Sequence, residues 1–134
     1  MTVVIDASVA MKWLIDSDES GRARGLIGTA ILVAPDLIMA EVANALWRYV
    51  AAGQIPPPKA AAAMTAFRRT LDRTYPLAPL ADAALAMAGT IGHTAYDCFY
   101  VALAEDLHAT VVTADRRLIT KVAGTAWQDR IRSL

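Results

Sequence analysis

Hydrophobic and polar positions alternate along this chain between two kinds of segment. Short apolar runs rich in β-branched residues occur at 2–6, 31–34 and 110–113, and each ends at a polar residue or a proline. Such runs are typical of strands buried in a parallel sheet. Longer stretches with apolar residues at helical spacing separate them, so the pattern predicts strands alternating with helices and a sheet covered on both faces.

The helical stretches carry start and stop signals. We expect helices at 9–14, 20–28, 36–53, 57–71, 80–89, 96–108 and 116–122, and a short edge strand at 75–77. Ser8 and Asp36 are suited to cap the first and third helices, because short polar side chains accept hydrogen bonds from free N–H groups at a helix start. The prolines at 56–58 are tolerated in a first helical turn, so they start a helix and mark no linker.

Length and composition predict one compact domain spanning residues 1–134. The chain is 56% hydrophobic with a mean hydropathy of +0.37, which argues against disorder. The single cysteine, Cys98, excludes an internal disulfide and suits a reducing compartment, and its apolar helical surroundings predict a core thiol. No window approaches the ~20 apolar residues of a membrane span, and Asp6 and Lys12 interrupt the first apolar stretch, so we expect a cytoplasmic protein without a membrane segment.

The net charge of the chain does not indicate a nucleic-acid-binding protein. Thirteen basic and thirteen acidic residues give a formal charge of zero, and the pI is about 6.7. The balance changes locally if several acids are withdrawn into a pocket, since the remaining surface is then richer in arginine.

Four acids stand where apolar elements begin or end. Asp6 closes the first strand run and Asp115 follows the last one, while Glu41 and Asp97 begin strongly apolar helical patterns. The carboxyl ends of parallel strands form the ligand-binding edge of an open α/β sheet. Two charges about 4 Å apart repel by roughly 4 kcal/mol at an effective dielectric of ~20, so converging carboxylates need protons or a bound cation. Taken singly, Asp6 and Asp115 could instead cap helices.

The motifs, in chain order, are 4–8 (VIDAS), 35–41 (beginning PDL and ending in Glu41), 96–97 (YD) and 113–118 (TADRRL). This set resembles the PIN-domain ribonucleases, in particular the VapC-type toxins of toxin–antitoxin systems, from Val3 to about Leu118. The resemblance implies a three-layer α/β/α PIN-like fold with a short central parallel sheet. It also implies a catalytic, metal-binding set made of Asp6, Glu41, Asp97 and Asp115.

The implied chemistry is hydrolysis of RNA by a water molecule that Mg²⁺ or Mn²⁺ activates, because both ions prefer hard oxygen ligands. Ser8 and Thr113 match polar positions that support the site, and Asn44 lies one helical turn after the second acid. Arg116 and Arg117 are candidates for contacting substrate phosphates. Because they follow the last acid directly, the sequence leaves open whether one or two ions bind.

The resemblance further implies a homodimer and a cognate antitoxin whose tail lies in an apolar groove beside the acids. Trp13, Leu14, Leu46, Trp47 and Val50 supply large apolar side chains that either form such an interaction surface or pack in the core.

Two other functions compete with this interpretation. One is a PIN-fold protein-interaction or RNA-processing module outside a toxin–antitoxin system. The other is phosphate transfer through an aspartyl nucleophile at Asp6, but that chemistry asks for a second Asp two residues later, where this chain has Ser8. His93 and His108 match no catalytic motif and receive no role, and Tyr96 is expected in the core or at an interface.

Overall fold

The computed structural model describes residues 1–134 and contains one five-stranded sheet in the order β3-β2-β1-β4-β5. All four strand pairs are parallel. The strands are β1 (Thr2–Ile5), β2 (Ile31–Pro35), β3 (Arg73–Tyr75), β4 (Thr110–Thr113) and β5 (Ile131–Ser133). The helices are α1 (Ala7–Leu14), α2 (Ser20–Arg24), α3 (Leu37–Ala51), α4 (Pro57–Thr70), α5 (Ala81–Ile91), α6 (Ala95–Asp106) and α7 (Arg116–Val122), with 3₁₀ turns at Ala78–Leu80 and Gln128–Arg130.

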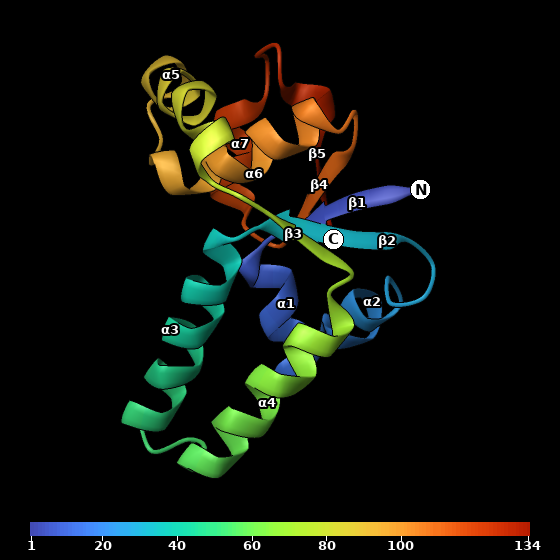
Figure 1. Ribbon diagram of the computed structural model, residues 1–134, viewed down its shortest axis with the longest axis vertical. Helices are drawn as coiled ribbons and strands as arrows, with labels where there is room; N and C mark the ends of the chain where they lie inside the picture. The colour runs from blue at the N-terminus through green and yellow to red at the C-terminus, as the bar shows by residue number, and fades with distance from the viewer.

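Helices cover both faces of this short sheet. Figure 1 shows α1 to α4 on one side and α5 to α7 on the other, with α3 and α4 forming a long helical hairpin that projects away from the strands. This arrangement confirms the three-layer α/β/α fold with a short central parallel sheet. It also explains why β1 and β4 contain only β-branched residues and no charged one, since a strand covered on both faces is shielded from water.

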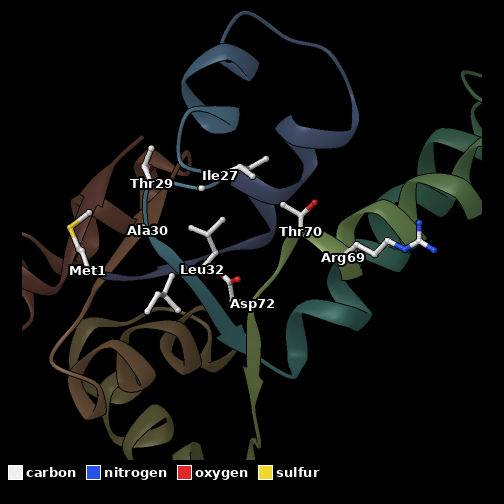
Figure 2. Close-up of a pocket in the computed structure, with 10 residues that line it drawn as sticks. Met1, Ile27, Thr29, Ala30, Leu32, Arg69, Thr70 and Asp72 are labelled. Atoms are coloured by element: carbon white, nitrogen blue, oxygen red, sulfur yellow. Dashed lines mark hydrogen bonds between the residues drawn. The ribbon is translucent and has the colours of Figure 1, made fainter.

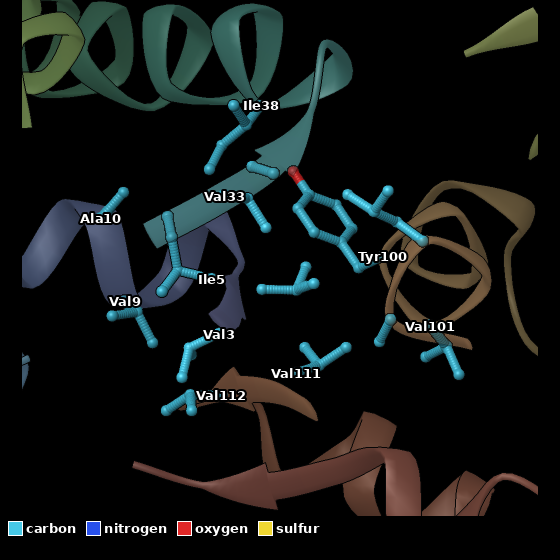
Figure 3. Packing of buried hydrophobic residues seen from close by; sticks show 14 of the residues in the cluster. Val3, Ile5, Val9, Ala10, Val33, Ile38, Tyr100, Val101, Val111 and Val112 are labelled. Atoms are coloured by element: carbon cyan, nitrogen blue, oxygen red, sulfur yellow. The ribbon is translucent and has the colours of Figure 1, made fainter. Parts of the chain in front are cut away.

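The core lies where the central strands meet α6. Val4, Ile5, Val111 and Val112 are fully buried, and the ring of Tyr100 packs among the side chains of the central strands (Figure 3). A buried tyrosine needs a hydrogen-bond partner for its hydroxyl. That partner lies in the site described below.

Predicted element positions hold in the centre of the sheet and fail at its edges. The strands at 2–5, 31–35 and 110–113 match the predicted runs. The edge strand β3 lies two residues earlier than predicted, and β5 was not predicted. Both consist of only three residues that are largely exposed or half-buried, so they lack the apolar run by which a central strand is recognised. Helix α2 ends at Arg24, four residues before its predicted end.

One capping prediction was wrong, and the other holds in position only. Asp6, not Ser8, occupies the N-cap of α1, and its side chain accepts a hydrogen bond from Val9 N. Ser8 lies inside the first helical turn and turns its hydroxyl toward the site. Asp36 precedes α3 without a side-chain capping bond; its backbone N–H instead donates to Tyr75 O at 2.8 Å, which ties the end of β2 to β3.

The apolar side chains considered for an interaction surface divide between core and surface. Trp13 and Leu46 are buried, and the Trp13 indole N–H donates to Ala23 O at 2.8 Å. Trp47 is 62% exposed, and Tyr96, which was expected in the core or at an interface, is 65% exposed. Core packing therefore accounts for Trp13 and Leu46 but not for Trp47 or Tyr96.

Candidate metal-binding active site

The site lies where the order of the strands reverses. The chain builds outward from β1 through β2 to β3 and then returns to place β4 on the other side of β1. The register pairs Ile5 with Val112, so Asp6 and Thr113 follow side by side at the carboxyl edge. Ligands of open α/β folds bind at this kind of switch point.

Asp6 is held by hydrogen bonds to both of its carboxylate oxygens. Oδ1 accepts from the Ser8 hydroxyl at 2.5 Å and from Val9 N at 3.1 Å, and Oδ2 accepts from the Thr113 hydroxyl. The side chain is only 7% exposed. Its orientation is therefore fixed by the helix start on one side and by β4 on the other.

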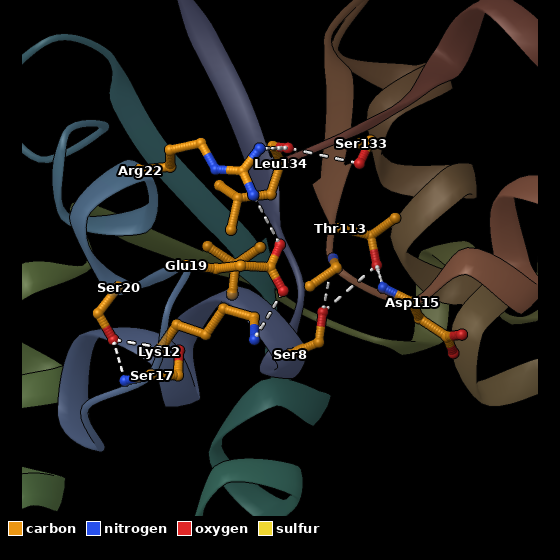
Figure 4. A network of polar contacts seen from close by, with 12 residues as sticks. Ser8, Lys12, Ser17, Glu19, Ser20, Arg22, Thr113, Asp115, Ser133 and Leu134 are labelled. Atoms are coloured by element: carbon orange, nitrogen blue, oxygen red, sulfur yellow. Dashed lines mark hydrogen bonds and ion pairs between the residues drawn. The ribbon is translucent and has the colours of Figure 1, made fainter.

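Ser8 and Thr113 join the loops that follow β1 and β4. The Ser8 hydroxyl accepts from Ala114 N at 2.9 Å, and the Thr113 hydroxyl accepts from Asp115 N at 3.0 Å (Figure 4). The two hydroxyl oxygens lie 3.4 Å apart. Ser8 and Thr113 therefore support the site through hydrogen bonds, because together they fix the loop that carries Asp115 against the one that carries Asp6.

Glu41 projects from the first turns of α3 and is bonded from the core. The Tyr100 hydroxyl donates to Glu41 Oε1 at 2.5 Å, while the Tyr100 ring is buried beneath the sheet edge. This contact joins residues 59 positions apart in sequence. Burial and the neighbouring Glu41 raise the pKa of Tyr100, so its hydroxyl stays a donor.

Asp97 stands in the first turn of α6 and meets a histidine from the preceding loop. His93 Nε2 lies 2.5 Å from Asp97 Oδ2. The histidine therefore fixes the carboxylate of Asp97, although the sequence interpretation gave it no role.

Burial and mutual repulsion act together on these acids. Burial raises the pKa of Asp6 above its usual range, with a smaller contribution from the charge of Asp97. Burial likewise raises the pKa of Glu41, and the charges of Asp97 and Asp6 add to the effect. Asp6, Glu41 and Asp97 thus lie close enough to repel one another, which is the coupling that a bound cation relieves.

Asp115 stands apart from this coupled group. It caps α7, accepting from Arg117 N at 2.9 Å, and the Arg117 guanidinium Nε lies 3.6 Å from the same oxygen. The helix-capping alternative is therefore realised for Asp115 as it is for Asp6. Asp115 connects to the other acids through Thr113, which bonds to both loops.

The acids offer suitable donors without forming a ready-made ligand cage. No three or more Asp, Glu, His or Cys side chains are arranged as a metal-binding group. Each carboxylate is instead held by its own neutral or basic partner. The donor chemistry nevertheless fits Mg²⁺ or Mn²⁺, since these ions take one or two carboxylates and keep several waters. Metal binding stays a prediction.

The remaining predicted residues lie beside the acids. Asn44 lines a cavity of about 680 Å³ together with Ser8, Glu41 and Tyr96, and it makes no side-chain hydrogen bond. Arg116 is exposed at the start of α7, next to the capping Asp115. The structure thus places Asn44 beside Glu41, and Arg116 beside Asp115.

Sequence reasoning missed His93 and Tyr100. A tyrosine in the apolar helix 96–108 was a usable signal, because a buried hydroxyl requires a partner. His93 gave a weaker one. It lies four residues before Asp97, but Gly92 ends α5 with φ +64° and α6 begins only at Ala95, so helical spacing does not apply between them.

Cys98 is a core thiol, as the sequence predicted. It is fully buried, and burial, followed by the nearby charge of Asp97, raises the pKa of Cys98 to about 11. A thiol with that pKa is protonated at neutral pH and is no nucleophile.

A separate cavity of about 580 Å³ lies at the opposite, amino edge of the sheet. Its lining includes Met1, Ile27, Arg69 and Asp72 (Figure 2). Asp72 Oδ2 accepts from Leu32 N at 2.7 Å and so supports the start of β2. None of the four candidate acids lines this cavity.

No helix combines the length and the apolar character that crossing a membrane requires.

Comparison with known proteins agrees with this geometry. The PIN domain profile matches residues 3–124. The chain is 36% identical to ribonuclease VapC1 of Mycobacterium tuberculosis over 117 residues, covering 86% of each protein, and 34% identical to ribonuclease VapC9 of the same species over 116 residues, covering 87% of each. Ribonuclease VapC3 of Pyrobaculum aerophilum is 32% identical over 90% of this chain and 95% of the relative.

Solved structures agree in fold. The crystal structure of PAE2754 from Pyrobaculum aerophilum superposes with a TM-score of 0.70 at 26% identity, covering 93% of this chain and 90% of the other. VapBC2 from Rickettsia felis gives the same TM-score at 10% identity, over 100% and 99% of the two chains, and so shares the fold. A profile match to most of the chain, with relatives above 30% identity, places this protein in the PIN-domain family, among its VapC-type members.

Proposed function

We propose that this chain is a cytoplasmic endoribonuclease, the toxin of a toxin–antitoxin pair, that hydrolyses RNA phosphodiester bonds with Mg²⁺ or Mn²⁺. The observation that carries the proposal is the coupled group of Asp6, Glu41 and Asp97 at the switch point of the sheet, with the pKa of Asp6 and Glu41 raised. The ribonuclease names of the VapC relatives support the same activity.

Asp6, Glu41, Asp97 and Asp115 would hold the ion. Bound there, a divalent cation supplies Lewis-acid polarisation of the phosphodiester and a water of lowered pKa. The chain's own part is positioning: Ser8 and Thr113 orient Asp6, Tyr100 orients Glu41, and His93 orients Asp97. Residues that orient ligands in this way typically contribute 10–100-fold to metal affinity or activity.

The cognate antitoxin would occupy the cavity of about 680 Å³ beside Glu41. Met11, Leu37 and Tyr96 give this cavity an apolar wall, and Glu41 offers a negative charge to a basic side chain of the partner. The exposed Trp47 lies on the same helix as Glu41 and is available for a homodimer or antitoxin contact. Size-exclusion measurements with light scattering test the dimer, and a monomer at micromolar concentration contradicts it.

Cleavage of total RNA by the purified chain, followed by mapping of fragment ends, tests the activity. We expect 5′-phosphate and 3′-hydroxyl ends, produced only with Mg²⁺ or Mn²⁺ and absent in excess EDTA. Asp97→Asn should lose the activity, whereas Asp72→Asn, an acid exchanged at the far edge, should keep it. Cleavage that persists undiminished in EDTA contradicts the proposal.

The alternative is a PIN-fold enzyme that processes RNA outside a toxin–antitoxin pair. It would use the same chemistry but would have a different effect on the cell. Induced expression separates the two. A toxin arrests growth and is neutralised by co-expression of its neighbouring gene, whereas a processing enzyme does neither.

A further inference from the structure

Next to the acids, α7 and the loop before α6 line an open surface pocket of about 400 Å³ that we call the basic pocket. Its lining consists of five polar side chains: His93, Arg116, Arg117, Thr120 and Lys121. Three of these are arginine or lysine, and no acid is among them. A chain with equal numbers of acidic and basic residues therefore gathers positive charge at one place.

The pocket follows from the spacing along α7. Arg116 and Thr120 are four residues apart, as are Arg117 and Lys121, so the two members of each pair lie on one side of the helix, and the two pairs are neighbours that line the same pocket. The Thr120 hydroxyl donates to Arg116 O at 2.9 Å and is thereby fixed against the helix. Arg116 and Lys121 form no ion pair, so their charges remain available to an anion.

Two of the lining residues also touch the candidate metal ligands. His93 Nε2 lies 2.5 Å from Asp97 Oδ2, and Arg117 Nε lies 3.6 Å from Asp115 Oδ1. An anion in the pocket would therefore lie beside Asp97 and Asp115, and the pocket shares no lining residue with the cavity at Glu41 and Asn44. RNA is a chain of anions at regular spacing, so a strand with one phosphate at the acids presents its neighbour to such a pocket.

We propose that the basic pocket binds the RNA backbone phosphate adjacent to the scissile one, with Arg116 and Lys121 as its main cationic contacts. The proposal rests on the proposed function for the position of the scissile phosphate. It extends the sequence prediction for Arg116 and Arg117 to a defined pocket that includes Lys121, Thr120 and His93. The ligand is an internal phosphodiester, held by charge without reading the base.

Binding of a short fluorescent single-stranded RNA tests this, with Mg²⁺ present and in a Glu41→Gln background in which the proposed chemistry is suppressed. Arg116→Gln/Lys121→Gln should weaken binding about tenfold. It should also lower the slope of log affinity against log salt concentration by about 0.7, the value for one lost phosphate contact on a single strand. The control Lys59→Gln/Arg68→Gln removes one lysine and one arginine from exposed positions on α4 and should leave the slope unchanged.

A scan with single methylphosphonate linkages then locates the phosphate. In the background protein, one internal neutral linkage should weaken binding, and the same linkage should have no further effect in the Arg116→Gln/Lys121→Gln protein. Loss at a terminal phosphate only, or competition by inorganic phosphate at low concentration, would assign the pocket to a free phosphate and overturn the proposal. Equal slopes for the pocket and control variants overturn it as well.

The two proposals fail in different ways. If the chain binds RNA with the expected pocket dependence but never cleaves it, the ribonuclease activity fails and the phosphate pocket stands. If the chain cleaves RNA and the pocket variant has the kcat/KM of the α4 control, the pocket fails and the activity stands.

Discussion

The two edges of the sheet each carry an aspartate that accepts a backbone N–H, and they differ in what surrounds it. At the amino edge, Asp72 bonds to Leu32 N at 2.7 Å and lines a cavity with Arg69, with no second acid in that lining (Figure 2). At the carboxyl edge, Asp6 bonds to Val9 N at 3.1 Å but is also buried and repelled by Asp97. The backbone bond is therefore common to both aspartates, and only Asp6 combines it with burial and with repulsion from a neighbouring acid.

The largest difference between substitutions at the two edges is expected in the rate of RNA cleavage. Asp97→Asn removes one carboxylate from the coupled group, and we expect a loss of at least about 100-fold in kcat/KM, in line with the weight of metal-assisted chemistry. Asp72→Asn should change kcat/KM less than about twofold. Equal losses for both variants in a single-turnover RNA cleavage assay would show that the two edges of the sheet do not differ in catalytic importance.

A smaller loss is expected when the support of Glu41 is removed. Tyr100→Phe keeps the buried ring and deletes only the hydroxyl that donates to Glu41 Oε1. We expect about a 10-fold loss of activity, the usual effect of removing a group that orients a metal ligand. The control is Tyr75→Phe at the edge strand β3, which should retain full activity; a Tyr100→Phe protein with the same activity as this control contradicts the orienting role.

For the stability of the fold we expect the opposite order, with the larger effect from the substitution at the amino edge of the sheet. Asp72→Ala deletes the acceptor for Leu32 N and should lower the free energy of unfolding by about 1 to 2 kcal/mol, or Tm by about 3 to 6 °C. Asp97→Asn in metal-free buffer should leave Tm unchanged or raise it, because the isostere removes repulsion from Asp6 and Glu41. Thermal melts in EDTA decide the matter, and a large drop in Tm for Asp97→Asn would show that its charge stabilises the fold.

The smallest effect concerns pH. The pKa of Glu41 is raised in the folded protein, so its contribution to stability is fully present below its unfolded value of about 4.3 and is lost as pH rises through the folded value. Without metal, the Tm of the wild type relative to Glu41→Gln should therefore fall from pH 4 toward neutrality, about 4 being the lower limit set by the unfolded pKa. Differential scanning of both proteins across that range measures the trend, and a relative Tm that rises with pH refutes it.

The central strands could be predicted because their signals are local. The proximity of Asp6, Glu41 and Asp97 was predicted as well, whereas Asp115 stands apart and metal binding by the four acids stays a prediction. β1 and β4 consist only of β-branched residues with two adjacent valines at the centre, and Asp6 and Asp115 follow them within two residues. The edge strand β5 could not be found, because only Ile131 in it is buried.

The contacts of the site were beyond the sequence for a different reason. Tyr100 reaches Glu41 across 59 residues, and His93 reaches Asp97 across a helix break, so neither pair shares a local period. The cap of α1 was mispredicted for the same reason, because it depends on a contact distant in sequence. Ser8 Oγ accepts a hydrogen bond from Ala114 N and donates one to Asp6, so Asp6 and not Ser8 caps the helix.

The bonds between the loops after β1 and β4 also determine when the site can exist during synthesis. Thr113 reaches Asp6 across 107 residues, and Ala114 reaches Ser8 across 106. A chain emerging from the ribosome carries Asp6 and Glu41 long before it carries Thr113 and Tyr100, which orient them. Domains acquire their contacts as units once their sequence is out. We therefore expect nascent chains ending before β4 to have no assembled site, so that an RNA-cleaving protein made on the ribosome, itself built of RNA, remains inert until β4 has been synthesised.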